Sequence, residues 1–217
     1  MLTRTNILSG LRTERTTIFV ILVLHAVGIC GLMSPWRGLF QMLTPINLIL
    51  TGWLVFRHIS RRSFTTLLVI GVAAYTLEWV GVHTGMPFGV YSYGETLGPK
   101  ISEVPPVIGL NWMLLLAASH SLLSRWISSP WMLAFLGAFA MVFLDILIEP
   151  VAIALDFWTW EAVNIPIQNY VSWWVASFVF GIFLAKIAPV RNTRALNVLF
   201  LVQAAFFLVL NIGIQWF

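Results

Sequence analysis

Residues 78–112 read EWVGVHTGMPFGVYSYGETLGPKISEVPPVIGLNW, and this stretch decides how the rest of the chain is interpreted. It begins with Glu78 inside an apolar run, passes through a loop rich in Gly, Pro and Tyr, and enters a second apolar run at Asn111 and Trp112. Residues 145–174, DILIEPVAIALDFWTWEAVNIPIQNYVSWW, repeat this plan with acids, an aromatic loop and a further Asn and Trp. The remaining sequence is mostly apolar, and we interpret it as a scaffold that brings the two stretches together.

The composition is that of a membrane protein. The 217 residues are 59% apolar and only 9% charged, whereas soluble domains carry about 25% charged residues. The mean hydropathy is +0.91. We therefore predict one all-α transmembrane domain over residues 1–217. The net charge of +4 is explained by basic loops between spans and not by a nucleic-acid partner, and the single Cys30 excludes an internal disulfide or a Cys-rich metal site.

Apolar segments long enough to cross a bilayer occur about seven times along the chain. The predicted spans are residues 18–33, 38–56, 65–82, 105–123, 130–149, 169–185 and 195–215. With the N-terminus in the cytoplasm, ten Lys and Arg residues fall on the inner side, and only Arg37 and Lys100 fall outside. This bias follows the positive-inside rule. It predicts a multi-pass protein of the cell membrane with the C-terminus and both aromatic loops outside.

Three carboxylates are predicted to lie inside the membrane at a similar depth in its outer half. Glu78 is in the third span, and Asp145 and Glu149 share one face of the fifth span because they are four residues apart. Burying an ionisable group in a span costs about 2.5–3.5 kcal/mol on insertion scales, so such groups are functional candidates. Carboxylates that are close together and have no cationic partner cannot all ionise cheaply, which predicts a protonated acid beside an ionised one. That pair is suited to moving a proton to and from an apolar substrate.

A structural role is the alternative for these acids. They would then form hydrogen bonds between helices, and Glu149 would lie at the water interface.

Polar and aromatic residues near the same level are candidates for substrate binding. An Asn side chain is able to orient a water molecule or a carboxylate, although Asn169 also suits a helix cap. Aromatic faces stabilise a cationic intermediate. The predicted substrate-binding residues are Tyr91, Tyr93, Asn111, Trp112, Asn169 and Trp173.

Other candidates near these residues are given smaller roles. Trp158, Trp160 and Trp216 are predicted to belong to an interfacial aromatic belt. His83 is the only His placed to assist the acids, and the His spacings do not support a metal site. Gly81 and Gly85 are explained by close packing or turn geometry.

The two quoted stretches resemble the signatures of the membrane carotenoid-biosynthesis family that includes the carotenoid hydratases. Together they cover about 65 residues, and the other spans agree in hydropathy alone. The resemblance implies addition of water to the terminal C1=C2 double bond of an acyclic carotenoid end without a redox cofactor. Implied substrates include monocyclic carotenoids such as γ-carotene and C50 precursors of bacterioruberin. By position, Glu78, Asp145 and Glu149 correspond to the family's motif acids.

On this reading an acid protonates C2, a tertiary cation forms at C1, and water adds there. Asp145, the deepest acid, is predicted to be the proton donor, with Glu78 or Glu149 holding the water. The substrate reaches the site from the membrane lipid, and the sequence does not indicate an oligomeric state.

Two other functions remain open at this point. A membrane lycopene cyclase protonates the same kind of alkene, but its cation closes a ring instead of meeting water. Asn111 and Asn169 are the candidate water-binding groups that distinguish the hydratase. A proton-coupled transporter would use the same acids, but it is expected to place them at broken helices near the midplane.

Overall fold

The structure is a computed structural model that describes residues 4–214, with side chains described for residues 13–213. The end of the last predicted span, Gln215, and the predicted belt residue Trp216 lie outside the described residues. The helices within this range are α1 (Arg4–Leu32), α2 (Arg37–Met42), α3 (Thr44–Phe56), α4 (Arg61–Thr84), α5 (Val107–Leu123), α6 (Pro130–Ala154), α7 (Ile167–Ile187) and α8 (Arg194–Ile214). Two short strands, β1 (Tyr91–Tyr93) and β2 (Trp158–Trp160), complete the described elements.

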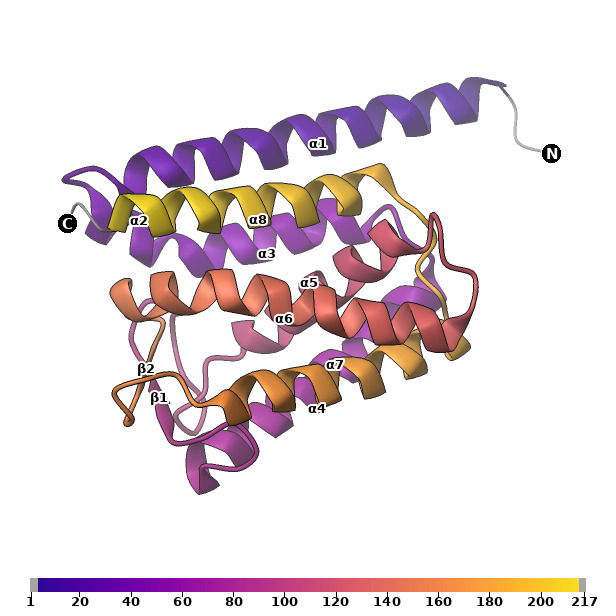
Figure 1. Ribbon diagram of the computed structural model, residues 1–217. Coiled ribbons are helices and arrows are strands. Elements are labelled where there is room, and N and C mark those ends of the chain that lie inside the picture. Colours follow the sequence, from indigo (N-terminus) through magenta and orange to yellow (C-terminus); the bar gives the residue numbers. More distant parts are fainter. Residues whose placement is uncertain (1–3, 215–217) are drawn as a thin grey trace.

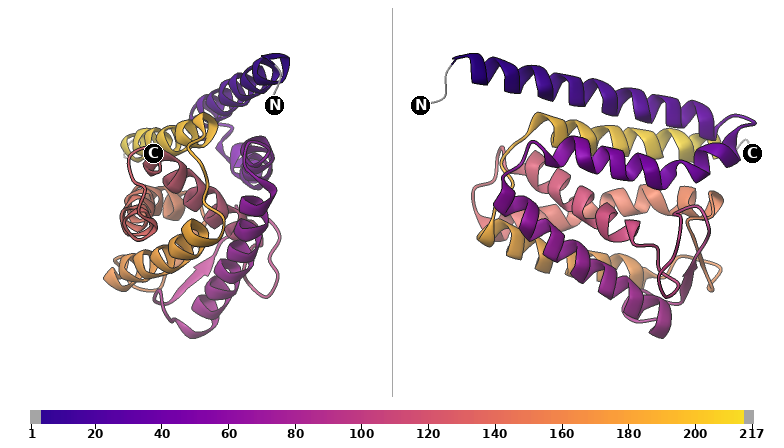
Figure 2. Two further views of the ribbon diagram at one scale, coloured as in Figure 1. Left: turned by 90° about the vertical axis from the view of Figure 1, so that its right-hand side faces the viewer. Right: turned by 180° about the vertical axis from the view of Figure 1, so that it is seen from behind.

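The helices form an elongated bundle in which successive elements run back and forth (Figure 1). The two strands lie at the end of the bundle where α8 ends, and α1 begins at the opposite end. Helix α1 packs along α8, and α6 packs along α7, which all views in Figures 1 and 2 show. Helix α5 lies at the centre, where residues 112–121 are all buried.

Within residues 4–214, five helices are long and apolar enough to cross a membrane: α1, α4, α6, α7 and α8. This agrees with an all-α, multi-pass membrane protein. The shorter apolar helices α3 and α5 lie among them. The count of seven spans and the orientation of the two ends therefore remain predictions.

The second predicted span, residues 38–56, is not one helix. It is divided into α2 and α3 at Leu43, and Pro45 lies in the first turn of α3. Proline has no backbone N–H and clashes with the preceding turn, so it suits a helix start and interrupts a helix interior. The 13 residues of α3 are about 20 Å long at 1.5 Å per residue, which is shorter than the hydrocarbon core.

Strands β1 and β2 join the two aromatic loops, for which the sequence predicts no strand. They pair antiparallel, with Tyr91 opposite Trp160 and Tyr93 opposite Trp158. We call this two-stranded element the ribbon. Thr96 Oγ1 also donates to the carbonyl of Leu155 at 2.7 Å. The two stretches that the sequence singled out are therefore one joined structure.

Two glycines at the end of α4 allow the ribbon to pack closely against this helix. A Cβ on Gly81 would lie 2.9 Å from the Tyr91 hydroxyl, so only glycine leaves room for that side chain. Gly85 ends the helix with φ +70, a left-handed conformation that glycine adopts without strain. The expectation that these glycines serve packing and turn geometry is confirmed.

Candidate active site

All three predicted carboxylates are buried near the ribbon. Glu78 projects from α4 and is 3% exposed, while Asp145 and Glu149 project from α6 and are each 1% exposed. Helix α6 continues beyond Glu149 to Ala154. Glu149 is thus enclosed by protein, and the alternative that it simply meets interfacial water is wrong.

The Glu78 carboxylate accepts hydrogen bonds from three neutral side chains. The Tyr91 and Tyr93 hydroxyls donate to Oε2 at 2.5 and 2.8 Å. The Trp112 indole N–H donates to Oε1 at 2.9 Å. Donors of this kind favour a charged carboxylate over a neutral one.

Glu149 has a matching set of three donors. The indole N–H groups of Trp158 and Trp160 donate to Oε2 at 3.0 and 2.9 Å. The Asn169 amide donates to Oε1 at 3.1 Å. In both halves of the site, the ribbon therefore supplies two donors and the start of the next helix supplies the third.

Asp145 is bound more sparsely than the two glutamates. Its Oδ2 accepts from the same Asn169 amide at 3.0 Å, so this amide bridges Asp145 and Glu149. Its Oδ1 is buried and has no hydrogen-bond partner among the described residues. Every described partner of the three acids is neutral. An unpartnered oxygen beside another carboxylate is a suitable place for a proton.

The register of the ribbon explains how four donors reach two acids. Side chains alternate along a strand, and directly opposed residues share a face, so Tyr91, Tyr93, Trp158 and Trp160 all point inward. Burial, together with the nearby Glu78 carboxylate, raises the pKa of the Tyr91 and Tyr93 hydroxyls above its ordinary value. These hydroxyls therefore remain protonated donors at physiological pH.

A small cavity of about 20 Å³ lies between the two glutamates. We call it the acid cavity. Its lining residues are Glu78, Phe88, Tyr91, Tyr93, Ile108, Glu149, Trp158, Trp160, Asn169 and Trp173. A polar space of this size holds about one water molecule.

A larger cavity of about 210 Å³ adjoins the acid cavity, and Ile108 and Trp158 line both. We call it the apolar cavity. It is lined by side chains from α1, α2, α3, α5, α6 and α8 and from β2. No Asp, Glu, Lys or Arg occurs among its described lining residues. The site thus combines a space for water with a space for a neutral apolar chain.

The six predicted substrate-binding residues divide between these spaces. Tyr91, Tyr93, Asn169 and Trp173 line the acid cavity, whereas Asn111 lines the apolar cavity. Trp112 lies behind the acid cavity, where its ring stacks on Trp173 with centroids 4.0 Å apart.

Asp145 and Asn169 differ in part from their predicted surroundings. Asp145 is not among the residues that line the acid cavity. Asn169 bonds the two acids of α6 rather than capping α7, whose N-cap is Pro166.

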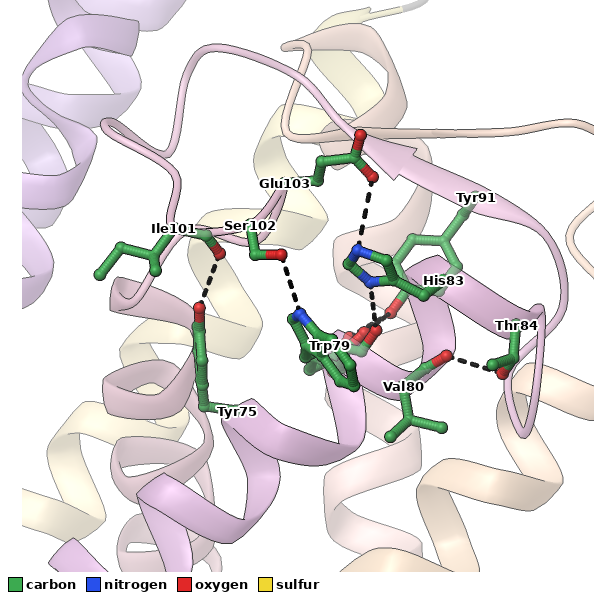
Figure 3. Close-up of polar contacts among 10 residues, drawn as sticks. Tyr75, Trp79, Val80, His83, Thr84, Tyr91, Ile101, Ser102 and Glu103 are labelled. Atoms are coloured by element: carbon green, nitrogen blue, oxygen red, sulfur yellow. Dashed lines mark hydrogen bonds and ion pairs between the residues drawn. The ribbon is translucent and has the colours of Figure 1, made fainter.

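Two expectations from the sequence are wrong. Trp158 and Trp160 are not only an interfacial belt, because both donate to Glu149. Their spacing of two residues in a strand was the available signal. His83 does not reach the acids: its Nδ1 lies 2.8 Å from the Trp79 carbonyl and its Nε2 3.9 Å from Glu103, as Figure 3 shows.

The fold and site define a polytopic α-helical membrane protein with a buried cluster of carboxylates beside an apolar cavity. Residues 36–217 match the family described as carotenoid biosynthesis protein, and the chain belongs to that family. The matched range includes both aromatic loops and every residue that lines the acid cavity.

One curated relative is similar over part of its length. Over 133 residues the chain is 29% identical to bisanhydrobacterioruberin hydratase of Haloarcula japonica. The match covers 58% of this chain and 45% of that protein, so it spans less than half of the relative. No solved structure matches the chain significantly.

Proposed function

We propose that the protein is a carotenoid hydratase that adds water to the terminal C1=C2 double bond of an acyclic carotenoid end. The acid cavity carries this proposal, because two buried carboxylates face a space for about one water molecule beside a cavity for an apolar chain. Membership of the carotenoid biosynthesis family supports the substrate class. The relative named as a hydratase supports the reaction type.

The proposed reaction needs one proton and one water molecule. The alkene's π electrons take a proton onto C2, which leaves a tertiary cation at C1. The oxygen of the confined water then bonds to C1, and the proton it releases returns to a carboxylate. Atoms and charge balance without an oxidant, so the proposed enzyme is a hydro-lyase that works without a cofactor.

The hydrogen bonds suggest how the acids divide these roles. Glu78 has three donors and lines the cavity, so we assign it to hold the water and receive its proton. Asp145 has an unpartnered oxygen, so we assign it to hold the catalytic proton. Because Asp145 does not line the cavity, Glu149 passes that proton to the alkene, with the Asn169 amide aligning the two.

The aromatic lining suits the cationic intermediate. Phe88, Trp158 and Trp173 line the acid cavity, and an aromatic face near a cation contributes about 0.5–2 kcal/mol. The carotenoid chain would occupy the apolar cavity and present its end past Ile108 and Trp158. We further propose seven passes through the cell membrane, a cytoplasmic N-terminus and entry of the substrate from the lipid.

The proposal is tested by expressing the chain in cells that make lycopene or γ-carotene and analysing the pigments by mass spectrometry. In heavy water the product should retain one deuterium at C2 for each hydrated end. In ¹⁸O-labelled water it should gain one heavy oxygen. Pigment with deuterium but no oxygen would indicate a cyclase, unchanged pigment a transporter, and oxygen derived from O₂ a redox reaction.

A further inference from the structure

Besides Thr44, whose hydroxyl donates to the Phe40 carbonyl at 3.2 Å, the apolar cavity is lined by four neutral polar side chains that the proposed hydration steps do not use. They come from four different helices: His25 from α1, Asn47 from α3, Asn111 from α5 and Gln203 from α8. The other lining residues are almost all apolar. Polar groups from four separate helices therefore converge on one cavity.

Two of these groups have a buried oxygen without a partner. Asn47 Oδ1 and Gln203 Oε1 have no hydrogen bond among the described residues, and Gln203 is only 6% exposed. Buried polar groups are nearly always hydrogen-bonded, and leaving one unpaired costs about 1–3 kcal/mol. Both oxygens are acceptors, so the missing partner is a hydrogen-bond donor.

His25 adds a third acceptor to the same cavity. Its Nδ1 lies 2.8 Å from the carbonyl oxygen of Ile21, which accepts but does not donate. The ring proton therefore sits on Nδ1, and Nε2 of the neutral ring is left as an acceptor. The Asn and Gln amide nitrogens supply donors, so a group that both donates and accepts would be satisfied here.

We propose that the apolar cavity recognises a hydroxyl group on a neutral isoprenoid chain, with Asn47 and Gln203 as the residues that bond it. A hydroxyl is the smallest group with the required donor and acceptor. A charged headgroup is unsuited, because no described lining residue is ionised to pair with it. The inference extends the proposed function, since the hydroxyl either is made by the hydration or is already present on the substrate.

The first test measures binding to the purified full chain in nanodiscs. Tritiated farnesol is displaced by unlabelled farnesol or by farnesene, the C15 isoprenoid that corresponds to farnesol after loss of water and has no hydroxyl. Farnesol should displace the label at a concentration about tenfold lower, as expected for one or two buried hydrogen bonds. Equal displacement by both compounds would mean that water alone satisfies the polar groups, and would overturn the inference.

Variants identify the residues responsible. Asn47→Leu with Gln203→Leu should abolish the preference for farnesol and leave farnesene binding in place. Thr51→Val is the matched control, because Thr51 is on α3, has a buried oxygen without a described partner, and does not line the cavity. A double variant that still prefers farnesol would refute the assignment.

Kinetics separate the two sources of the hydroxyl. If the reaction makes it, the double variant should show weaker inhibition by the hydrated product. If the substrate already carries it, the double variant should show a raised KM for a hydroxylated carotenoid. If neither constant changed, the inference would fail. If the protein preferred farnesol but hydrated no carotenoid, the proposed function would be refuted and the hydroxyl-binding inference would stand.

Discussion

Each glutamate of the site is held by a different set of neutral donors. Glu78 has two phenol hydroxyls and one indole, whereas Glu149 has two indoles and one amide. Fixed donors stabilise charge without reorganising during the reaction. Both glutamates are thus arranged to accept hydrogen bonds as carboxylates, whereas Asp145, with one unpartnered oxygen, is the acid with room for a proton.

Replacing the acids with their amides tests this arrangement. Glu78→Gln, Asp145→Asn and Glu149→Gln keep the side-chain shape while removing ionisation. At least two of the three should lower hydration by about 10²-fold or more, the usual contribution of general acid–base catalysis. The measurement is the yield of hydrated pigment, divided by the amount of each variant found in the membrane. Near-normal activity in all three variants would show that the acids are structural.

Removing one donor should have a smaller effect. Tyr93→Phe deletes one of the three hydrogen bonds to Glu78 without changing the ring. A hydrogen bond to a charged group contributes about 1.5–3 kcal/mol, so hydration should fall by about tenfold or more. Thr76→Val is a control, because its hydroxyl bonds only the α4 backbone at Val72. Equal activity in the two variants would contradict this role for Tyr93.

The same tyrosines predict how stability depends on pH. The pKa of Tyr93 is raised by burial and by Glu78, so the folded protein holds this proton more tightly than the unfolded chain does. The resulting stabilisation is complete below a pH of about 10, the pKa of an unfolded tyrosine. It is lost as the pH rises further. Unfolding in detergent at graded alkaline pH should show this loss, and Tyr93→Phe should reduce its steepness.

Much of the site could be predicted at the level of single residues. Placing an acid in an apolar membrane span costs free energy and is therefore rare, so Glu78, Asp145 and Glu149 stand out in the sequence. Trp158 and Trp160 do not, because Trp is also common at membrane interfaces. Their role depends on strand pairing with Tyr93 and Tyr91 of the other aromatic loop, a contact between distant segments that no local pattern indicates.

At the level of elements, the ribbon makes one site from two loops. Gly94 N–H donates to Phe157 O, and Glu161 N–H donates to Val90 O, each at 3.0 Å. In an antiparallel ladder this places the intervening Tyr–Trp pairs at positions that are not hydrogen-bonded, where side chains are closest. Ring centroids of Tyr91 and Trp160 are accordingly 5.1 Å apart.

A cysteine pair tests the register of the ribbon. Ser92 and Thr159 are directly opposed on its exposed face, with their hydroxyl oxygens 3.3 Å apart. Ser92→Cys with Thr159→Cys, in a Cys30→Ser background, should form a disulfide on mild oxidation, because opposed residues of a ladder lie within bonding range. Mobility on a non-reducing gel is the measurement.

Activity should survive this crosslink, since the two side chains face away from the acids. Each single cysteine variant serves as the control. Failure to form the disulfide would contradict this register. Formation of the disulfide with complete loss of activity, if reduction then restored the activity, would show that the ribbon does not keep this register during the reaction.

The elements also show where a sequence pattern is insufficient. Each described helix overlaps one of the predicted apolar segments, but a single segment, residues 38–56, covers both α2 and α3. Hydropathy averages over a window, whereas the break depends on one residue, Pro45, and its effect on backbone hydrogen bonding. The two strands do alternate, but three residues are too few for that alternation to identify a strand from the sequence.

At the level of the whole molecule, the order of the helices is consistent with the predicted topology. The loops between α3 and α4, α5 and α6, and α7 and α8 lie at the same end of the bundle as the start of α1 (Figure 1). A reporter after Phe217 should therefore be outside the cell, and reporters inserted near Arg125 or Asn192 should be cytoplasmic. A cytoplasmic C-terminus would contradict seven passes and would move the ribbon to the inner face.

A chamber for one water molecule must be refilled after every turnover. On the proposed reaction, the alkene arrives from the hydrocarbon phase, while water arrives from the aqueous phase beyond the ribbon. Strands β1 and β2 would then be the boundary across which two immiscible reagents meet. The rate should follow the thermodynamic activity of water, so concentrated sugar in the medium should slow turnover without changing the affinity for the carotenoid. Initial rates at graded osmolality would measure this dependence.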